Sequence, residues 1–313
     1  MNSSPSRVPN RKGIILAGGT GSRLYPLTAA LNKHLLPIYD KPMIYYPLTT
    51  LMLAGIRDIV VVSSPAALPQ LRACLGTGAQ WGIELDYAEQ RAPNGIVDAL
   101  LAASHQLEGR AFTLILGDNI FYRTGLPKHL QRAASRDNGA TIFVYPVSDP
   151  RPFGVLVLDG ASRPVAIEEK PKHPPSNLAV TGLYFYDHRA LEFARMLRPS
   201  ARGEIEVTDL NRVYLERGEL LVIELGRGSA WLDGGTPEQL HNASDFVRVL
   251  EERTGLKIAC PEEVAYRMGF ITQQDLAAIV GTMCDSPYRG YIASVLTSPE
   301  SPHQMRAEWL PQE

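Results

Sequence analysis

The stretch Gly13-Ile14-Ile15-Leu16-Ala17-Gly18-Gly19-Thr20-Gly21-Ser22-Arg23-Leu24 joins an apolar run to a glycine-rich segment. The apolar run predicts a buried β-strand. The glycines after it can adopt positive φ and expose consecutive backbone N–H groups, as phosphate-binding loops do. Arg23 stands where a dinucleotide-binding fingerprint would have its third glycine, and it adds a permanent forked charge. With Lys33 ten residues later, the sequence predicts a loop that holds a triphosphate between two cations.

The overall composition is that of a globular protein with a large core. The chain has 313 residues, of which 45% are hydrophobic, and a formal net charge of −2. This balance lacks the basic excess expected for binding to nucleic acid or a membrane surface. Residues 1–10 are polar and unlike a secretory signal, and no segment reaches the roughly 18 apolar residues of a membrane span. The three cysteines show no metal-binding spacing, so we expect reduced thiols in a cytoplasmic protein.

Apolar β-branched runs alternate with helical patterns through the first half of the chain. This alternation predicts a Rossmann-like α/β fold whose mainly parallel central sheet is flanked by helices, with ligands at the carboxyl ends of the strands. Pro47 is expected to kink the first helix. After the opening strand, the predicted strands are 59–62, 112–116 and 141–144, and the predicted helices are 43–54 and 95–105.

A smaller mixed β region is expected after residue 154. It begins with a hairpin around Asp159-Gly160 and continues with strands at 178–186 and 221–225. A helix over 237–253 follows, where Thr236 caps, Pro237 takes the first position and Gln239 can close a capping box. Short helices are predicted at 262–268, 274–280 and 288–296.

These patterns suggest a division of the chain into one main domain and a helical region. We expect an α/β domain over 12–253, followed by a helical region over 254–296. The apolar faces of this helical region could pack on their own subunit or on a partner. The tails 1–11 and 297–313 are expected to be mobile.

Two aspartates end strand-like runs and are followed by turn residues. They are Asp118 in Leu116-Gly117-Asp118-Asn119 and Asp233 in Trp231-Leu232-Asp233-Gly234-Gly235. Both positions fall at the carboxyl edge of the predicted sheet, where carboxylates and phosphate oxygens suit Mg²⁺. Each aspartate could instead be a structural turn or cap residue.

Several blocks, taken in order, resemble the sugar-phosphate nucleotidyltransferases and, among them, the glucose-1-phosphate thymidylyltransferase (dTDP-glucose pyrophosphorylase) family. The resemblance runs from about Lys12 to Leu296 and begins with the patterns GGxGxRLxP and KxLLP. The other blocks are YDKPMIYYPL at 39–48, LGDNIFY at 116–122, EEKP at 168–171, VTGLYFYD at 180–187, SARGE at 200–204 and WLD at 231–233.

The resemblance implies a Mg²⁺-assisted in-line attack of α-D-glucose 1-phosphate on the α-phosphorus of dTTP. The products would be dTDP-glucose and pyrophosphate, in the first step of dTDP-L-rhamnose synthesis. It also implies a nucleotide-binding part at about 12–150 and a sugar-phosphate-binding part at about 151–235. The helical region 254–296 would serve the oligomeric or regulatory contacts of a homotetramer with feedback inhibition by a late product such as dTDP-L-rhamnose. Both reactants are anions, so the protein's task is charge neutralisation and alignment, without a side-chain nucleophile.

The family's functional residues carry over to matching positions of this chain. The implied catalytic residues are Arg23, Lys33 and Asp118, and the implied metal ligands are Asp118 and Asp233. The implied nucleotide-binding residues are Leu16, Gly18, Gly19, Thr20, Gly21, Ser22, Arg23, Gln90, Gly95 and Asp118. The implied sugar-phosphate-binding residues are Asn119, Gly154, Glu169, Lys170, Val180, Tyr184 and Arg202. Lys170 and Arg202 could also be solvated surface cations, and Glu168-Glu169 a polar strand end.

Base choice can be argued from the Gln90 amide. It could accept a hydrogen bond from thymine N3–H and donate one to O4, which cytosine cannot reciprocate. Uracil differs from thymine only by a methyl group, so this contact would not reject it.

Several positions depart from the family's usual pattern, among them Ile96-Val97, which stands where Leu-Ala is usual. Asp98 replaces a neutral Gln close to the base-binding residues, where an added carboxylate would repel phosphates unless it is paired or points away. Gly234, His34 and Phe153 stand where Thr, Gln and Tyr are usual. The departures leave open an enzyme that uses UTP or another sugar phosphate, and a catalytically silent regulatory paralogue. An NAD-dependent enzyme is disfavoured by Arg23 in the place of the third glycine.

Overall fold

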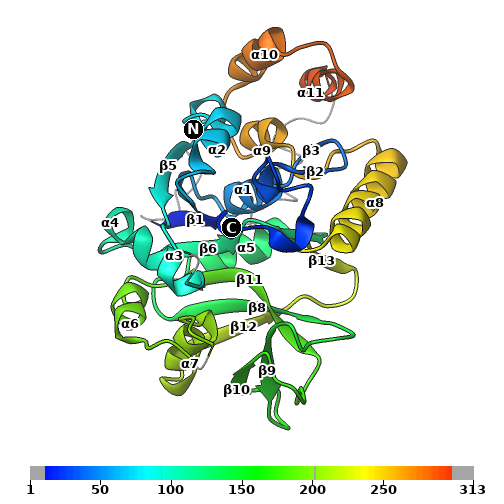
Figure 1. Ribbon diagram of the computed structural model, residues 1–313. Coiled ribbons are helices and arrows are strands. Elements are labelled where there is room, and N and C mark those ends of the chain that lie inside the picture. Colours follow the sequence, from blue (N-terminus) through cyan, green and yellow to red (C-terminus); the bar gives the residue numbers. More distant parts are fainter. Residues whose placement is uncertain (1–10, 93, 201, 298–313) are drawn as a thin grey trace, which may run out of the picture.

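A mixed β-sheet runs through the middle of the molecule (Figure 1). Within residues 11–92, 94–200 and 202–297, which the computed structural model describes, nine strands form it in the order β10-β9-β11-β6-β1-β4-β5, with β8 beside β11 and β12 beside β8. The strands are β1 (Lys12–Leu16), β4 (Asp58–Ser63), β5 (Glu84–Glu89), β6 (Phe112–Leu116), β8 (Ala140–Pro146), β9 (Gly154–Leu158), β10 (Pro164–Glu169), β11 (Leu178–Tyr186) and β12 (Leu220–Glu224).

The half of the sheet that comes first in the sequence is parallel. Strands β6, β1, β4 and β5 pair in parallel, with Leu16 opposite Leu116 across β1 and β6. Strand β11 then pairs antiparallel with β6, β8 and β9, and β9 with β10, while β12 lies parallel to β8. The predicted α/β class with a largely parallel sheet is therefore confirmed, and the antiparallel part begins at β11.

Helices cover both faces of the sheet because its strands are apolar on both sides. Ile15 and Val61 contribute to one core and Ile14 and Val60 to the other, as the two-residue period of a strand requires. The first core packs against α1 (Tyr45–Leu53), α2 (Leu68–Leu75), α5 (Leu126–Ala134), α9 (Pro261–Arg267), α10 (Gln273–Thr282) and α11 (Pro287–Thr297). The second packs against α3 (Ile96–Ala102), α4 (Ser104–Leu107), α6 (Ala190–Met196) and α7 (Val207–Glu216).

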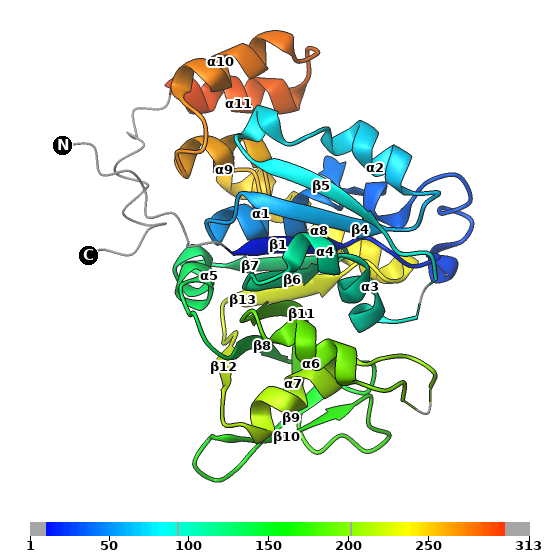
Figure 2. The same ribbon diagram turned by 90° about the vertical axis from the view of Figure 1, so that its left-hand side faces the viewer.

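A third core joins distant parts of the chain. Helix α8 (Pro237–Thr254) packs against the small hairpin of β2 (Pro37–Ile38) and β3 (Lys41–Pro42), through apolar side chains that include Val247 and Ile38. The β9–β10 hairpin and helices α10 and α11 lie at opposite ends of the molecule (Figures 1 and 2). Short 3-10 turns are η1 (Ser22–Leu24), η2 (Lys33–Leu35) and η3 (Ala79–Trp81).

A two-stranded ribbon outside the main sheet brings two remote segments together. Strand β7 (Asn119–Arg123) pairs antiparallel with β13 (Ser229–Asp233), and Asp233 lies opposite Asn119. The sequence analysis predicted no strand at β7. This pairing carries Asp233 to the edge where Asp118 lies.

Several predicted details differ from the structure. Pro47 is the third residue of α1, where its missing N–H has no helical partner to lose, so the reason for a kink disappears. The helix expected over 95–105 is two helices that break at Ala103 (φ −91°, ψ 7°). In the β9–β10 loop, Asp159 accepts from the N–H groups of Ala161 and Arg163, and Ser162 takes φ +59°, so a two-residue Asp-Gly turn is wrong.

The predicted start of the helix over 237–253 is half confirmed. Thr236 accepts a hydrogen bond from Gln239 N at 3.2 Å, as an N-cap should. Gln239 Oε1 is buried without a hydrogen-bond partner among the described residues, so the capping box is open. No helix in this described part is long and apolar enough to cross a bilayer. Most of the tails expected to be mobile, residues 1–10 and 298–313, lie outside the described residues.

Candidate active site

A cleft of about 470 Å³ opens at the carboxyl ends of β1 and β6. Residues of β9, β10 and β11 also line the cleft. These strands belong to the same sheet (Figure 1). The predicted site residues that line it are Leu16, Gly18, Gly19, Arg23, Lys33, Gln90, Gly95, Asp118, Asn119, Gly154, Glu169, Lys170, Val180, Tyr184 and Asp233. Thr20, Gly21, Ser22 and Arg202 are not among the lining residues.

The glycine-rich loop and Asp118 leave the sheet side by side because β1 and β6 are parallel neighbours. Gly117 N donates to Leu16 O at 2.9 Å, which ties the two strand ends together. Gly19 (φ +90°) and Gly21 (φ +62°) adopt the left-handed conformations that the loop requires. The Arg23 guanidinium lies against Gly235, because a Cβ at Gly235 would be 2.9 Å from Arg23 Nη2.

Lys33 and Asp118 form an ion pair at the floor of the cleft. Lys33 Nζ is 2.5 Å from Asp118 Oδ2, and Asn119 Nδ2 donates to Asp118 Oδ1 at 2.9 Å. Burial alone would raise the pKa of Asp118, but the charge of Lys33 and these bonds outweigh it and lower the pKa. Burial and the charge of Lys33 lower the pKa of His34, so its ring is neutral. Asp118 is therefore an ionised carboxylate at neutral pH.

Asp233 has the opposite electrostatic environment. Burial and the negative charge of Asp118 raise its pKa to about 6, against the smaller effects of Arg23 and Lys33. Gly234 N donates to Asp118 O at 3.1 Å, so the backbone holds the two aspartates as neighbours. Their mutual repulsion is an electrostatic cost of the folded state that a bound cation would remove.

This pair of aspartates fits a hard divalent cation such as Mg²⁺. Such an ion takes one or two carboxylates and completes its shell with water and phosphate oxygens. Residues 11–92, 94–200 and 202–297 contain no cluster of three or more His, Cys, Asp or Glu side chains suited to a metal. Two carboxylates alone leave most of the coordination shell of such an ion to water and to oxygen atoms from outside the protein.

Asn119 holds the side chain of Asp118 in place through a hydrogen bond. Its Oδ1 accepts from Gly182 N at 3.1 Å and from Trp231 Nε1 at 2.7 Å, while its Nδ2 donates to Asp118. These bonds tie β7 to β11 and β13. Asn119 is almost fully buried and its oxygen accepts two hydrogen bonds, so it holds the carboxylate of Asp118 in position and also lines the cleft.

Glu169, the last residue of β10, is at the centre of a second group of contacts in the cleft. Thr208 Oγ1 donates to Glu169 Oε2 at 2.5 Å. A Cβ at Gly154 would lie 2.9 Å from Thr208 Oγ1, so a larger residue there would displace the hydroxyl group that contacts Glu169. Lys170 adopts φ +43°, a strained conformation for a side-chain-bearing residue, and its N–H donates to Phe153 O at 3.0 Å.

Arg202 lies beyond the lining residues, among three carboxylates. Its guanidinium is 3.6 Å from Glu169, 3.6 Å from Glu204 and 3.5 Å from Glu206, and its side chain is 43% exposed. Lys170 Nζ is 3.7 Å from Glu169 Oε1. The two cations implied to bind a sugar phosphate therefore meet at Glu169, with spacings too long for direct hydrogen bonds.

Gln90 is held differently from the sequence expectation. Its Nε2 donates to Gly95 O at 3.2 Å and to Asp98 Oδ2 at 2.9 Å, so both amide hydrogens are used within the protein. The expected donation to thymine O4 is thus not available in this arrangement, and Oε1 remains as an acceptor. Asp98 faces the amide of Gln90, which explains how the added carboxylate is paired.

Comparison with known proteins identifies the family. Residues 12–249 match the nucleotidyl transferase family. The chain belongs to this family. The nucleotidyltransferase is 49% identical to the glucose-1-phosphate thymidylyltransferase of Xanthomonas campestris pv. campestris over 285 residues, 91% of this chain and 97% of that protein. It is 50% identical to the protein of that name from Neisseria meningitidis (91% and 99% covered) and 49% identical to that from Mycobacterium tuberculosis (91% and 99% covered).

Solved structures agree with the fold of the nucleotidyltransferase. A Bacillus anthracis protein provisionally assigned as a glucose-1-phosphate thymidylyltransferase, solved in complex with sucrose, superposes with a TM-score of 0.71 at 39% identity. The match covers 76% of this chain and 95% of that one. A UDP-glucose pyrophosphorylase complexed with UDP-glucose gives 0.68 at 23% identity, over 77% of this chain and 99% of that one, which shows a shared fold.

The cleft of the nucleotidyltransferase also contains residues that the sequence analysis did not assign to it. Thr208 and Glu206 come from α7 and the segment before it, and no local pattern marked either. Trp231 was noted only as part of a motif, although its indole N–H braces Asn119. The other unassigned lining residues are His34, Ile96, Ala99, Leu116, Pro152, Phe153, Gly182, Glu204 and Val207.

Proposed function

We propose that this nucleotidyltransferase joins dTTP and α-D-glucose 1-phosphate to give dTDP-glucose and pyrophosphate. The observation that carries the proposal is the meeting, in one cleft, of the glycine-rich loop, the cations Arg23 and Lys33, and the repelling carboxylates Asp118 and Asp233. The names of relatives at about 49% identity support the same substrates. A site with this charge pattern suits a reaction between two phosphates.

The nucleotide half of the cleft would bind and align the triphosphate. Gly18 and Gly19, which line the cleft, would offer backbone N–H groups to the phosphates, and Arg23 would stabilise the departing pyrophosphate. Lys33 contacts the α-phosphate, while its bond to Asp118 holds its ammonium group in place. Asp118 and Asp233 would hold Mg²⁺, which supplies positive charge at the phosphate oxygens when bound.

The sugar half would present the nucleophile. Lys170 and Arg202 bind the phosphate of glucose 1-phosphate, with the Arg202 fork able to engage two oxygens. Glu169, held by Thr208, accepts hydrogen bonds from sugar hydroxyl groups. A phosphate oxygen of the sugar phosphate then forms a bond to the α-phosphorus as the bond to pyrophosphate breaks. The sugar wall is completed by Asn119, Gly154, Val180 and Tyr184.

The wider organisation extends this proposal. We place nucleotide binding in 12–150 and sugar-phosphate binding in 151–235, within a domain over 12–253. Region 254–296 would form contacts of a homotetramer and respond to a late product such as dTDP-L-rhamnose. A cytoplasmic location fits the proposed substrates and the free thiols of Cys74, Cys260 and Cys284.

A panel of triphosphates with glucose 1-phosphate and Mg²⁺, read by pyrophosphate release, tests the function. We expect turnover with dTTP, and loss of at least about 100-fold in kcat for Arg23→Ala. Arg163→Ala, which changes an exposed cation on the β9–β10 loop, serves as the matched control and should retain full activity. Equal activity of Arg23→Ala and the parent would overturn the assigned role.

UTP is a second candidate substrate because Gln90 leaves only its carbonyl oxygen for the base, and uracil shares the N3–H of thymine. Losing one methyl contact lowers kcat/KM by about 10- to 200-fold. A higher kcat/KM for UTP than for dTTP would replace the thymidylyl assignment. Saturable binding of dTDP-glucose without any pyrophosphate release would instead identify a silent paralogue.

A further inference from the structure

We propose that Asp98 is a positioning residue for base recognition, which restricts Gln90 to accepting a hydrogen bond from the base. The inference rests on the proposed function and deepens it. It concerns the one position near the base where this chain carries a carboxylate in place of a neutral side chain.

The orientation of the Gln90 amide follows from the chemistry of its neighbours. Gly95 O and Asp98 Oδ2 are both acceptors, at 3.2 and 2.9 Å from Gln90 Nε2. The reversed amide would place Oε1 against two oxygens and leave its hydrogens without these partners, so only one orientation is favourable. Gln90 is also 8% exposed, which adds the cost of an unpaired buried group to any reversal.

Asp98 is held in place by the start of α3. Gly95 precedes this helix with φ +108°, a conformation that favours glycine, and a Cβ there would be 3.0 Å from Ile205 O. Val97 and Leu100 are fully buried, which anchors the helix face next to Asp98. Both acceptors for the Gln90 amide thus come from the start of α3, which this packing holds in place.

The locked amide presents Oε1 to the cleft beside Gly18, since a Cβ at Gly18 would meet that oxygen at 2.9 Å. An acceptor at this position matches the N3–H of thymine or uracil. It opposes cytosine, whose N3 is itself an acceptor. The base O4 is not read by Gln90, because the amide has no hydrogen left to donate.

Two thymine analogues separate the two edges of the base. In the parent enzyme, 3-methyl-dTTP, which lacks N3–H, should lose at least about 100-fold in kcat/KM relative to dTTP. By contrast, 4-thio-dTTP, whose sulfur is a weak acceptor, should stay within about threefold, since no Gln90 hydrogen is lost. A penalty above tenfold for 4-thio-dTTP that disappears in Gln90→Ala would show that Gln90 donates to O4 and would overturn the proposal. A penalty that persists in Gln90→Ala would assign the donor to another group and would leave Gln90 as an acceptor.

Variants of Asp98 test the positioning role. Asp98→Ala should raise KM for dTTP by about tenfold with kcat within twofold, and should shrink the discrimination against 3-methyl-dTTP, because the amide is released. Asp98→Asn keeps an acceptor oxygen and should restore the parent values. Glu89→Gln, a half-exposed carboxylate at the end of β5, controls for loss of charge alone and should change neither.

Unchanged KM and unchanged discrimination in a folded Asp98→Ala protein would overturn the inference. Should that variant fail to fold, the analogue series in the parent decides the matter. Calorimetric titration of the full chain with dTTP and 3-methyl-dTTP gives the same comparison without turnover. Absence of pyrophosphate release from the parent with dTTP and with UTP would overturn the proposed function separately. Equal binding of dTTP and 3-methyl-dTTP to the parent would overturn the role of Asp98.

Discussion

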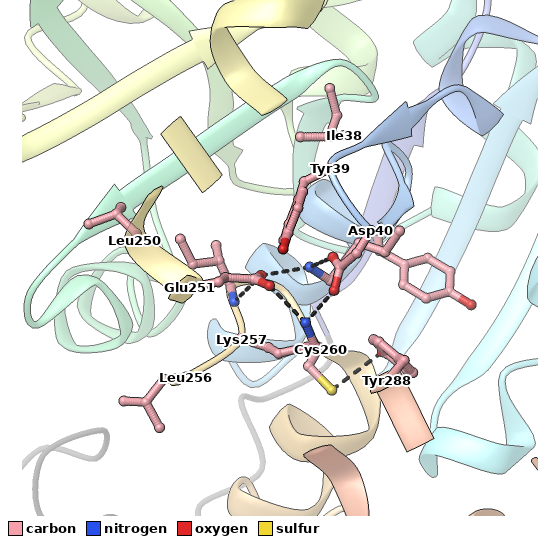
Figure 3. A network of polar contacts seen from close by, with 12 residues as sticks. Ile38, Tyr39, Asp40, Leu250, Glu251, Leu256, Lys257, Cys260 and Tyr288 are labelled. Atoms are coloured by element: carbon pink, nitrogen blue, oxygen red, sulfur yellow. Dashed lines mark hydrogen bonds and ion pairs between the residues drawn. The ribbon is translucent and has the colours of Figure 1, made fainter. Parts of the chain in front are cut away.

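Two charged clusters of this protein differ in how completely their charges are paired. The first is a network in which Lys257 contacts the carboxylates of Asp40 and Glu251 (Figure 3). Lys41 Nζ lies 2.5 Å from Asp40 and 2.8 Å from Glu251. Glu251 also accepts from Ile258 N at 2.8 Å. Two cations and two anions alternate there, at the junction of α8, the β2–β3 hairpin and the segment before α9.

The cleft also contains lysine or arginine and aspartate side chains, but their charges are less completely paired. Asp118 is paired with Lys33, whereas Asp233 faces the charge of Asp118. Burial tends to raise the pKa of Asp40 in the network, but Lys257 and Lys41 outweigh it and lower the pKa, while Asp233 is raised to about 6. Each charge of the network therefore has partners of opposite sign, whereas Asp233 in the cleft is destabilised by burial and by the charge of Asp118.

The largest expected effect is a loss of activity without a loss of folding. Asp118→Asn should lower kcat by about 10³-fold, because a preorganised charge near the reacting phosphates is lost. Thermal unfolding should shift little, since the repulsion with Asp233 disappears together with the Lys33 ion pair. Pyrophosphate release and calorimetry check both parts. If Asp118→Asn were inactive because it is unfolded, the charges of the cleft would be needed for folding, as we expect only for the network.

The network should respond in the opposite way. Glu251→Gln leaves Lys41 and Lys257 with Asp40 alone and should reduce the free energy of unfolding by about 3 kcal/mol, since buried charge loses its partner. Activity at low temperature should remain. Glu252→Gln, which alters an exposed pair with Arg248, is the control and should change stability by less than about 0.5 kcal/mol. Equal free energies of unfolding for the two variants would show that the network does not stabilise the fold more than an exposed ion pair does.

Removing Asp233 should stabilise the metal-free protein. Its pKa is higher in the folded state than in the unfolded chain, so between about pH 4 and 6 the folded state binds more protons and loses stability as pH rises. In EDTA at pH 7.5, Asp233→Asn should therefore gain roughly 1–3 kcal/mol, and the gain should vanish below pH 4. Unfolding measured across this pH range checks the prediction, and a gain that does not depend on pH would refute it.

The smallest effect concerns Arg202, whose ion pairs are half-exposed. Arg202→Lys should leave the free energy of unfolding within about 0.5 kcal/mol. It should raise KM for glucose 1-phosphate by about tenfold, because an ammonium group cannot bind two phosphate oxygens as a fork does. Arg198→Lys, an exposed neighbour, should leave KM unchanged. Steady-state kinetics at saturating dTTP would detect either outcome.

Local sequence patterns predicted much of this architecture. The apolar run before Gly18 is β1, and the strands expected at 59–62 and 112–116 are β4 and β6. Thr236 caps α8 as expected. These features depend on neighbouring residues and on burial, which periodicity and cap chemistry report directly. The loop and the two cations after β1 could be placed at one edge of the sheet for the same reason.

Other features depend on contacts between distant segments. The pairing of β7 with β13 joins residues more than a hundred positions apart and sets Asp233 beside Asn119. The left-handed conformation of Lys170 and the position of Arg202 outside the lining residues also had no local signal. Asp98 was visible as an unusual carboxylate, but its bond to Gln90 required the turn before α3.

The amino-acid sequence by itself therefore determined the parallel strands, the phosphate-type loop and the identity of the charged groups, because these follow from short-range patterns. Only the tertiary structure decided which of these charges are compensated by a partner within the protein and which are not. The reason is that a pKa and a hydrogen-bond direction depend on burial and on partners that the fold brings from elsewhere in the chain.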